Sequence, residues 1–244
     1  MNPKVLAARA KRLPRVFQVA AKPIGASCNL ACTYCYYLHK TELLPDKALR
    51  MSDEVLETFV RQYITGQDAA SITFTWHGGE PTLLGLDFFE KAVALQQRYA
   101  GTKSIENNFQ TNGLLLDEAW CDFLREHRFI VGLSIDGPER FHNAFRKERG
   151  GEPSFDRVYR AADLLRRCRV HFNTMTVVHS ANARHPEEVY RFVTQDLGAR
   201  WVQWLPCVER KDYPSTVRSA TTVSPATAAV PRRDFSRPRT AARV

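Results

Sequence analysis

Short apolar runs alternate with longer stretches of helical periodicity along most of the chain. Six runs are rich in β-branched and aromatic residues and end at glycine, proline or polar residues, which is typical of buried strands. These predicted strands cover residues 16–24, 72–76, 105–110, 129–135, 170–178 and 201–205. Apolar residues at helical spacing predict helices over residues 52–63, 86–99, 117–127, 155–167 and 186–196, with Ser52 as the first N-cap.

The order of these elements predicts the fold class. Apolar strands that alternate with helices form parallel sheets with right-handed crossovers. We therefore expect an α/β fold, an open and partial (β/α)6 TIM-like barrel. In such folds the chemistry collects on the loops at the carboxyl ends of the strands. The distinctive stretches of this sequence all follow predicted strands: a three-cysteine loop, Gly-Gly-Glu-Pro, Thr-Asn-Gly and Ser-x-Asp-Gly.

The positive charge of the chain is concentrated at its ends. The net charge is +9, but residues 1–22 hold six lysines and arginines with no acid, and residues 211–244 hold seven against two acids. The stretch between them is slightly acidic, so no basic body for gripping nucleic acid is predicted. We expect a basic segment over residues 1–21, a core domain over 22–210 and a disordered, proline-containing tail over 211–244.

The hydropathy pattern excludes a membrane-spanning helix and a secretory signal. No apolar run approaches the roughly 20 residues of a membrane span, and the basic start lacks a continuous apolar stretch. The six cysteines fit a reducing compartment, so we expect a cytoplasmic protein. Three of these cysteines, Cys121, Cys168 and Cys207, stand singly and are predicted to be core thiols.

The other three cysteines, Cys28, Cys32 and Cys35, fall within eight residues. Their sulfurs can converge on one point, and thiolates are the soft ligands that iron–sulfur clusters and zinc select. Three ligands leave a fourth position open, as a reactive centre requires. Buried thiols and disulfides are weaker interpretations. Zinc is the main alternative, because His39 follows Cys35 at a spacing that closes a Cys₃His site.

The spacing of these cysteines, with Tyr34 before the last, resembles the signature of radical S-adenosylmethionine (SAM) enzymes. Within that superfamily, residues 22–210 resemble the anaerobic sulfatase-maturating enzymes. The stretches that carry this closer resemblance are Lys22-Pro23, WHGGEPTLLGL at 76–86, QTNG at 110–113, GLSIDGP at 132–138, FN at 172–173, RHP at 184–186 and QWLP at 203–206.

The resemblance implies a cofactor site. Three cysteines hold one [4Fe–4S] cluster in this family, and SAM chelates the fourth iron. The backbone at Gly78 and Gly79 contacts the SAM amino group, and Glu80 stabilises that loop and the ammonium; a tight turn is the alternative for the two glycines. The remaining positions assigned to the cofactor are Tyr34, Tyr36, His77, Ser134, Arg146, Arg160 and Leu205.

Several of these assignments have specific roles. Ser134 offers a hydroxyl to the SAM carboxylate or ribose, and Arg146 and Arg160 are candidates to pair with the carboxylate. Both arginines also fit a solvated surface, and Ser134 fits a satisfied strand end. His77 occupies a position usually held by glutamine. Tyr37 is expected near the substrate.

The resemblance also implies the reaction. A reduced cluster passes one electron to SAM, and the resulting 5′-deoxyadenosyl radical takes a hydrogen atom from a cysteine or serine of a sulfatase, which becomes Cα-formylglycine. A flavodoxin or ferredoxin is the expected electron donor. The alternatives are a radical SAM enzyme for another peptide and a non-catalytic remnant that binds a cluster, SAM or a partner.

The chain departs from that family after its core. The family continues into a cysteine-rich domain that holds two further clusters and an aspartate thought to act as the base. This sequence has no cysteine after Cys207, and its tail resembles no part of the family, as after a truncation or frameshift. We expect a C-terminally shortened enzyme of this type, in which the catalytic base is not present.

Overall fold

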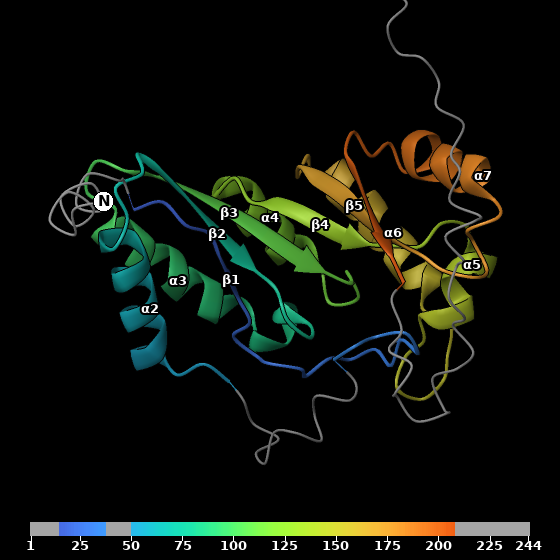
Figure 1. Cartoon of the computed structure of the whole chain (residues 1–244), viewed down its shortest axis with the longest axis horizontal. Coiled ribbons are helices and arrows are strands. Elements are labelled where there is room, and N and C mark those ends of the chain that lie inside the picture. The colour runs from blue at the N-terminus through green and yellow to red at the C-terminus, as the bar shows by residue number, and fades with distance from the viewer. Residues whose placement is uncertain (1–14, 38–49, 208–244) are drawn as a thin grey trace, which may run out of the picture.

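The structure is a computed structural model that describes residues 15–37 and 50–207 of the chain. Its centre is a six-stranded sheet with the strands in chain order, and all neighbouring strands are parallel (Figure 1). The strands are β1 Val19–Ala21, β2 Ser71–Trp76, β3 Ser104–Thr111, β4 Ile130–Ser134, β5 Phe172–Val178 and β6 Val202–Pro206. Among the described residues β6 does not pair with β1, so the sheet stays open. The predicted partial (β/α)6 barrel is confirmed.

Helices connect the strands. They are α2 Asp53–Thr65, α3 Leu86–Tyr99, α4 Glu118–Glu126, α5 Glu139–Phe145, α6 Phe155–Arg167 and α7 Pro186–Arg191. A short 3-10 helix, η2 Pro81–Leu84, follows β2, and a π-helical turn, η3 Phe192–Asp196, continues α7. The Ser52 hydroxyl accepts the Val55 N–H at 3.2 Å, which confirms the predicted N-cap.

Two of these helices were not predicted. α5 has seven residues and η2 has four, so neither offers the two turns over which a helical period becomes visible. α5 nevertheless places the segment that follows it against the cysteine loop. None of the helices in the described ranges is long and apolar enough to cross a membrane.

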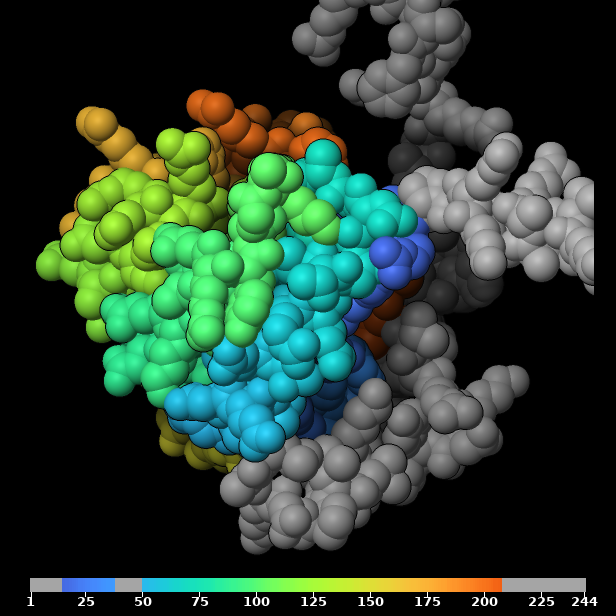
Figure 2. Space-filling view, turned by 90° about the vertical axis from the view of Figure 1, so that its left-hand side faces the viewer, coloured from blue at the N-terminus to red at the C-terminus, as the bar shows by residue number. Residues whose placement is uncertain are grey.

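The main core is a set of aromatic rings between the first strands and helices α2 to α4. Phe89 is fully buried and lies 5.0 Å from Phe109 and 5.6 Å from Trp76, measured between ring centroids. The Trp76 indole donates to the side-chain oxygen of Asn107 at 2.8 Å, so this buried polar group is satisfied. From the end that carries α2 and α3, the described residues form a continuous packed surface (Figure 2).

A second apolar cluster lies under the cysteine loop. Leu30 and Cys32 of the loop pack with Leu133 and Ile135 of the β4 region and with Val158 of α6. The loop is therefore fastened to the sheet by apolar burial as well as by hydrogen bonds.

The predicted core thiols have different fates. Cys121 is fully buried in the aromatic core, and Cys168 packs against that core. For Cys207 the prediction is wrong, because this residue follows β6 and lines a cavity.

Several predictions lie outside the described residues. They are residues 1–14 of the basic N-terminal segment, the alternative ligand His39 and the tail 211–244. The domain boundaries at 22 and 210 therefore stay predictions.

Phe89→Ala tests the aromatic core. Truncating a buried aromatic ring leaves a cavity, so we expect the free energy of unfolding to fall by about 3–5 kcal/mol. Urea denaturation followed by circular dichroism measures it. Tyr190→Ala is the control, since that ring is 56% exposed, and its effect should stay below about 0.5 kcal/mol. Equal effects of the two substitutions would contradict this account of the core.

Candidate active site

The cysteine loop, residues 22–37, follows β1 and is held by the chain that follows α5. Ala31 N–H donates to the Lys147 carbonyl at 2.8 Å, and Thr33 N–H donates to the Phe145 carbonyl at 3.0 Å. The Arg149 guanidinium donates to the carbonyl of Cys28 at 2.7 Å. The backbone of this loop is thus paired like an edge strand, which limits its movement.

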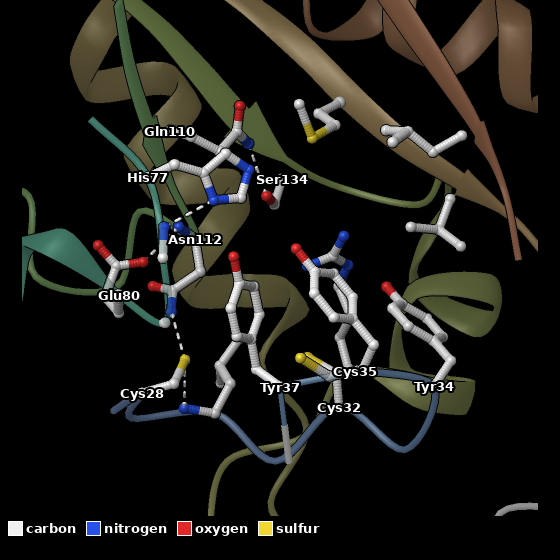
Figure 3. Close-up of a pocket in the computed structure, with 18 of the residues that line it drawn as sticks. Cys28, Cys32, Tyr34, Cys35, Tyr37, His77, Glu80, Gln110, Asn112 and Ser134 are labelled. Atoms are coloured by element: carbon white, nitrogen blue, oxygen red, sulfur yellow. Dashed lines mark hydrogen bonds between the residues drawn. The ribbon is translucent and has the colours of Figure 1, made fainter. Parts of the chain in front are cut away.

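The three cysteines line one cavity of about 460 Å³. Figure 3 shows them with Tyr37 on one side of this cavity, and His77, Gln110 and Ser134 on the other. The Cys28 sulfur accepts the Leu30 N–H at 3.4 Å. Burial raises the pKa of the Cys28 thiol to about 11, and burial raises that of Cys32 to about 12 although the Arg146 charge opposes it.

The arrangement of the sulfurs bears on which metal group fits. Among the described residues, no three cysteine, histidine or acidic side chains are grouped closely enough to hold one metal ion. The expected convergence of the sulfurs on a single point is therefore not found. A [4Fe–4S] cluster bonds each thiolate to a different iron, so three separate thiols along one wall of a cavity suit it. The three cysteines alone do not form a mononuclear zinc site.

The Gly-Gly-Glu loop after β2 lies directly on the cysteine loop. Gly79 N–H donates to the Gly25 carbonyl and Glu80 N–H donates to the Ser27 carbonyl, both at 2.8 Å. A Cβ atom at Gly79 would stand 1.8 Å from the Ser27 carbonyl oxygen. The glycine at 79 is thus required for contact between two stretches of backbone. The approach of this backbone to a ligand, which the sequence suggested, stays a prediction; both glycines line the cavity.

Glu80 joins the loops after β2 and β3 through its carboxylate, and its backbone N–H bonds to the cysteine loop. Its carboxylate accepts hydrogen bonds from the Thr82 hydroxyl at 2.7 Å, from the Thr111 hydroxyl at 2.8 Å and from the Asn112 N–H at 2.7 Å. The side chain is 1% exposed; burial raises the pKa of this carboxyl, and these donors oppose the shift. Both oxygens therefore serve the loops after β2 and β3.

The far wall of the cavity is built from strand ends. Gln110 of β3 donates from its amide to the Ser134 hydroxyl of β4 at 2.8 Å. Gly132 leaves room for that amide, because a Cβ atom there would meet the Gln110 oxygen at 2.1 Å. Next to it, His77 Nδ1 accepts the Gly78 N–H at 2.7 Å. Burial lowers the pKa of His77, so its ring is neutral at pH 7.

A buried ion pair closes the cavity beside Cys32. Arg146 donates from Nε and Nη2 to the two carboxylate oxygens of Asp136, at 2.9 and 3.2 Å. Tyr34 donates its hydroxyl to the same carboxylate. Burial tends to raise the pKa of Asp136, but the Arg146 guanidinium outweighs it and the pKa is lowered. The carboxyl is therefore ionised, and its charge compensates that of Arg146.

Most sequence-predicted residues meet at this cavity. It is lined by Cys28, Cys32, Tyr34, Cys35, Tyr36, Tyr37, His77, Gly78, Gly79, Glu80, Ser134, Arg146 and Leu205. Arg160 is the exception: the structure places it in a different hollow, on α6. Its Nε donates to the Asp156 carbonyl one turn back. The neighbouring Ala161, and not Arg160, is the residue that α6 buries.

Sequence reasoning missed other lining residues. They are Leu30, Gln110, Thr111, Asn112, Met175, Val177, Pro206 and Cys207. Met175 and Val177 stand two positions apart on β5, and alternate residues of a strand share a face. For these two residues that period was the available signal. At the ends of β3 and β6 three consecutive residues line the cavity, so the signal there was only their place at the carboxyl end of a predicted strand.

Comparison with known proteins supports this interpretation of the fold. A six-stranded parallel half-barrel with three cysteines on the loop after its first strand defines a class of metal-dependent radical enzymes. The family model of the radical SAM superfamily matches residues 23–193. The chain belongs to the radical SAM superfamily.

Its curated relatives point to one branch. The chain is 46% identical over 193 residues to a serine-type anaerobic sulfatase-maturating enzyme of Bacteroides thetaiotaomicron, covering 79% of this chain and 46% of that protein. It is 42% identical over 191 residues to a cysteine-type enzyme of Clostridium perfringens, covering 77% and 51%. The chain thus spans about half the length of the curated relatives it matches.

Solved structures agree. The structure of native anSMEcpe with bound AdoMet and the Cp18Cys peptide superposes with a TM-score of 0.76 at 37% identity, over 86% of this chain and 56% of that one. Streptococcus suis SuiB bound to S-adenosylmethionine has a TM-score of 0.62 at 16% identity, over 86% and 45%. The second likeness concerns the fold alone.

Gly79→Ala tests the contact between the two loops. The added methyl group overlaps the Ser27 carbonyl, so we expect a loss of about 3 kcal/mol in the free energy of unfolding and faster alkylation of the three loop cysteines in the metal-free protein. Gly101→Ala is the control. Its φ is +59° with open space around it, so it carries only the backbone cost of about 1–2 kcal/mol and should leave the alkylation rate unchanged. Unchanged alkylation in Gly79→Ala would refute the contact.

Proposed function

We propose that this chain is the catalytic core of a radical SAM oxidoreductase of the sulfatase-maturating type. The observation that carries the proposal is that Cys28, Cys32 and Cys35 line one cavity with the Gly-Gly-Glu loop, in a chain of this family. Bound there, a [4Fe–4S] cluster and SAM supply a 5′-deoxyadenosyl radical that accepts a hydrogen atom from a substrate carbon.

The residues of the chain divide the work of binding. Cys28, Cys32 and Cys35 would hold the cluster through their thiolates. The backbone of Gly78 and Gly79 faces the SAM amino group, and Glu80 acts by holding that loop in place. Ser134 is assigned to the SAM carboxylate or ribose, and Tyr34, Tyr36 and Leu205 are assigned to the adenosine part. His77 lies beside the Gly-Gly turn, and Tyr37 is assigned to the substrate side.

Part of the cavity wall is apolar. Met175 and Val177 of β5 and Leu205 of β6 contribute apolar side chains to it. Exclusion of water at the reacting atoms prevents side reactions of a radical that abstracts hydrogen atoms. Arg146 brings a guanidinium to the same wall, but two of its nitrogens donate to Asp136. Its pairing with the SAM carboxylate therefore competes with Asp136.

The proposed substrate is a sulfatase polypeptide whose cysteine or serine is oxidised to Cα-formylglycine. The names of the curated relatives support it, as does the Cp18Cys peptide bound in the superposed anSMEcpe structure. We further propose a one-electron carrier, such as a flavodoxin or ferredoxin, as the electron donor. A reducing, cytoplasmic setting is consistent with six free thiols. No base is assigned among the residues of this chain.

The cofactor assignment is tested under anaerobic conditions. The protein is reconstituted with iron and sulfide, given dithionite and SAM, and assayed for 5′-deoxyadenosine. We expect product from the native sequence, and none together with loss of bound iron in Cys28→Ala and Cys32→Ala. Cys168→Ala is the matched control and should retain both. Tightly bound zinc without iron would contradict the cluster, and a cluster without 5′-deoxyadenosine would leave a non-catalytic, cluster-binding protein.

The substrate is tested separately. A sulfatase-derived peptide with a Cys-x-Pro-x-Arg motif should show the mass change of thiol-to-aldehyde conversion, together with one 5′-deoxyadenosine for each aldehyde formed. The same peptide with serine tests the second substrate class, and alanine at that position is the control that should stay unmodified. If 5′-deoxyadenosine forms but neither peptide changes, the chain acts on another substrate.

A further inference from the structure

One buried group beside the cavity has no role in the function proposed above. Asp136 is 0% exposed, and it contacts two residues that line the cavity, Tyr34 and Arg146, without lining the cavity itself. Burying a charge is costly unless it is fully paired. A buried ion pair adds little to the free energy of folding, so stability alone does not account for Asp136 beside this cavity.

We propose that Asp136 is a positioning residue for the cofactor site. It fixes Tyr34 and Arg146 against the cysteine loop, and it compensates the charge of Arg146 beside Cys32. The charge-compensation part rests on the proposed function, because it concerns the cluster that the cysteines would hold.

The first argument is geometric. Tyr34 stands between Cys32 and Cys35, and its hydroxyl bonds to a carboxylate 102 positions later in the chain. Asp136 is itself fixed, since its carboxylate accepts the Val177 N–H at 2.9 Å and its carbonyl accepts the Asn182 side-chain amide at 3.0 Å. The carboxyl ends of β4 and β5 thereby determine where the cysteine loop lies.

The arginine fastens the same loop from the other side. Arg146 follows α5, and its neighbours in the chain, Phe145 and Lys147, accept the Thr33 and Ala31 N–H groups. Its guanidinium stands 5.5 Å from the centre of the Tyr34 ring. One carboxylate thus restrains both the loop and the segment that pairs with it.

The second argument is electrostatic. Arg146 and Cys32 line the same cavity, so the guanidinium charge lies in the space that the cluster would share with this cysteine. In a dry site an uncompensated cation there would favour the more negative, reduced form of a cluster and raise its reduction potential. Asp136 cancels that cation. The expected consequence is a low potential, which one-electron reduction of a sulfonium requires.

The geometric part is tested on the metal-free protein. Hydrogen–deuterium exchange of the peptide covering residues 28–37 should become several-fold faster in Tyr34→Phe and in Asp136→Asn. The matched controls are Tyr99→Phe and Asp163→Asn, which remove a surface hydrogen bond to Glu57 and surface ion pairs to Arg166 and Arg167. These should leave that peptide unchanged. Native-like exchange in both test variants would overturn the positioning role.

The charge part is tested on the reconstituted protein by a redox titration followed by electron paramagnetic resonance. Asp136→Asn should shift the potential in the positive direction, Arg146→Gln in the negative direction, and Tyr34→Phe should keep the native value. If Asp136 had only a structural role, the substitutions would change stability without shifting the potential in opposite directions. An unshifted potential in both Asp136→Asn and Arg146→Gln would therefore overturn the charge-compensation proposal. If Asp136→Asn does not fold, the sign in Arg146→Gln decides.

The two levels of inference fail in different ways. Native protein that takes up no iron contradicts the proposed function, while the exchange experiment still decides whether Asp136 positions the loop. A normal cluster with unshifted potentials leaves the proposed function intact and removes the charge compensation.

Discussion

The carboxylate of Glu80 is the interaction on which the cavity depends. It accepts hydrogen bonds from Thr82, Thr111 and Asn112, while the Glu80 N–H donates to Ser27 in the cysteine loop. Three loops that are far apart in the sequence are thereby joined at one buried point. A carboxylate suits this place because two oxygens can accept several donors at once. Without it, the loops after β2 and β3 would each have a buried donor to satisfy elsewhere.

The charged side chains of the ion pair beside the cavity are compensated by each other and not by water. Asp136 and Arg146 are both buried and compensate each other, and His77 is held neutral by burial. These three side chains therefore add little net charge to the cavity. The charges that matter for the chemistry would come from the thiolates and from the cofactors they hold.

The sequence allowed the fold to be predicted nearly completely, because most strands are compact apolar runs and each long helix has a clear period; β3, with only Ile105 and Phe109 apolar, is the exception among the strands. The sheet over β1 to β6 and the helices α2, α3, α4 and α6 were all expected. α5 was missed because it is shorter than two helical periods. The residues that follow it, 145–149, were consequently missed as the partner of the cysteine loop.

The candidate site was predictable where a residue type carries its own chemistry, as in Cys28, Cys32 and Cys35. It was not predictable where the role depends on a partner distant in the chain. Arg146 and Arg160 are the same residue type at similar positions after β4, yet only Arg146 faces the cavity. Arg146 is held there by the carboxylate of Asp136, whereas Arg160 is exposed on α6.

Two glycines of this site constrain its evolution differently. Gly79 faces the backbone carbonyl of Ser27, which every amino acid possesses, so no second substitution can make room for a side chain there. Gly132 faces the side chain of Gln110, and a smaller residue at 110 would create that room. Among homologous sequences, position 79 should therefore be constant by itself, whereas positions 110 and 132 should vary as a correlated pair.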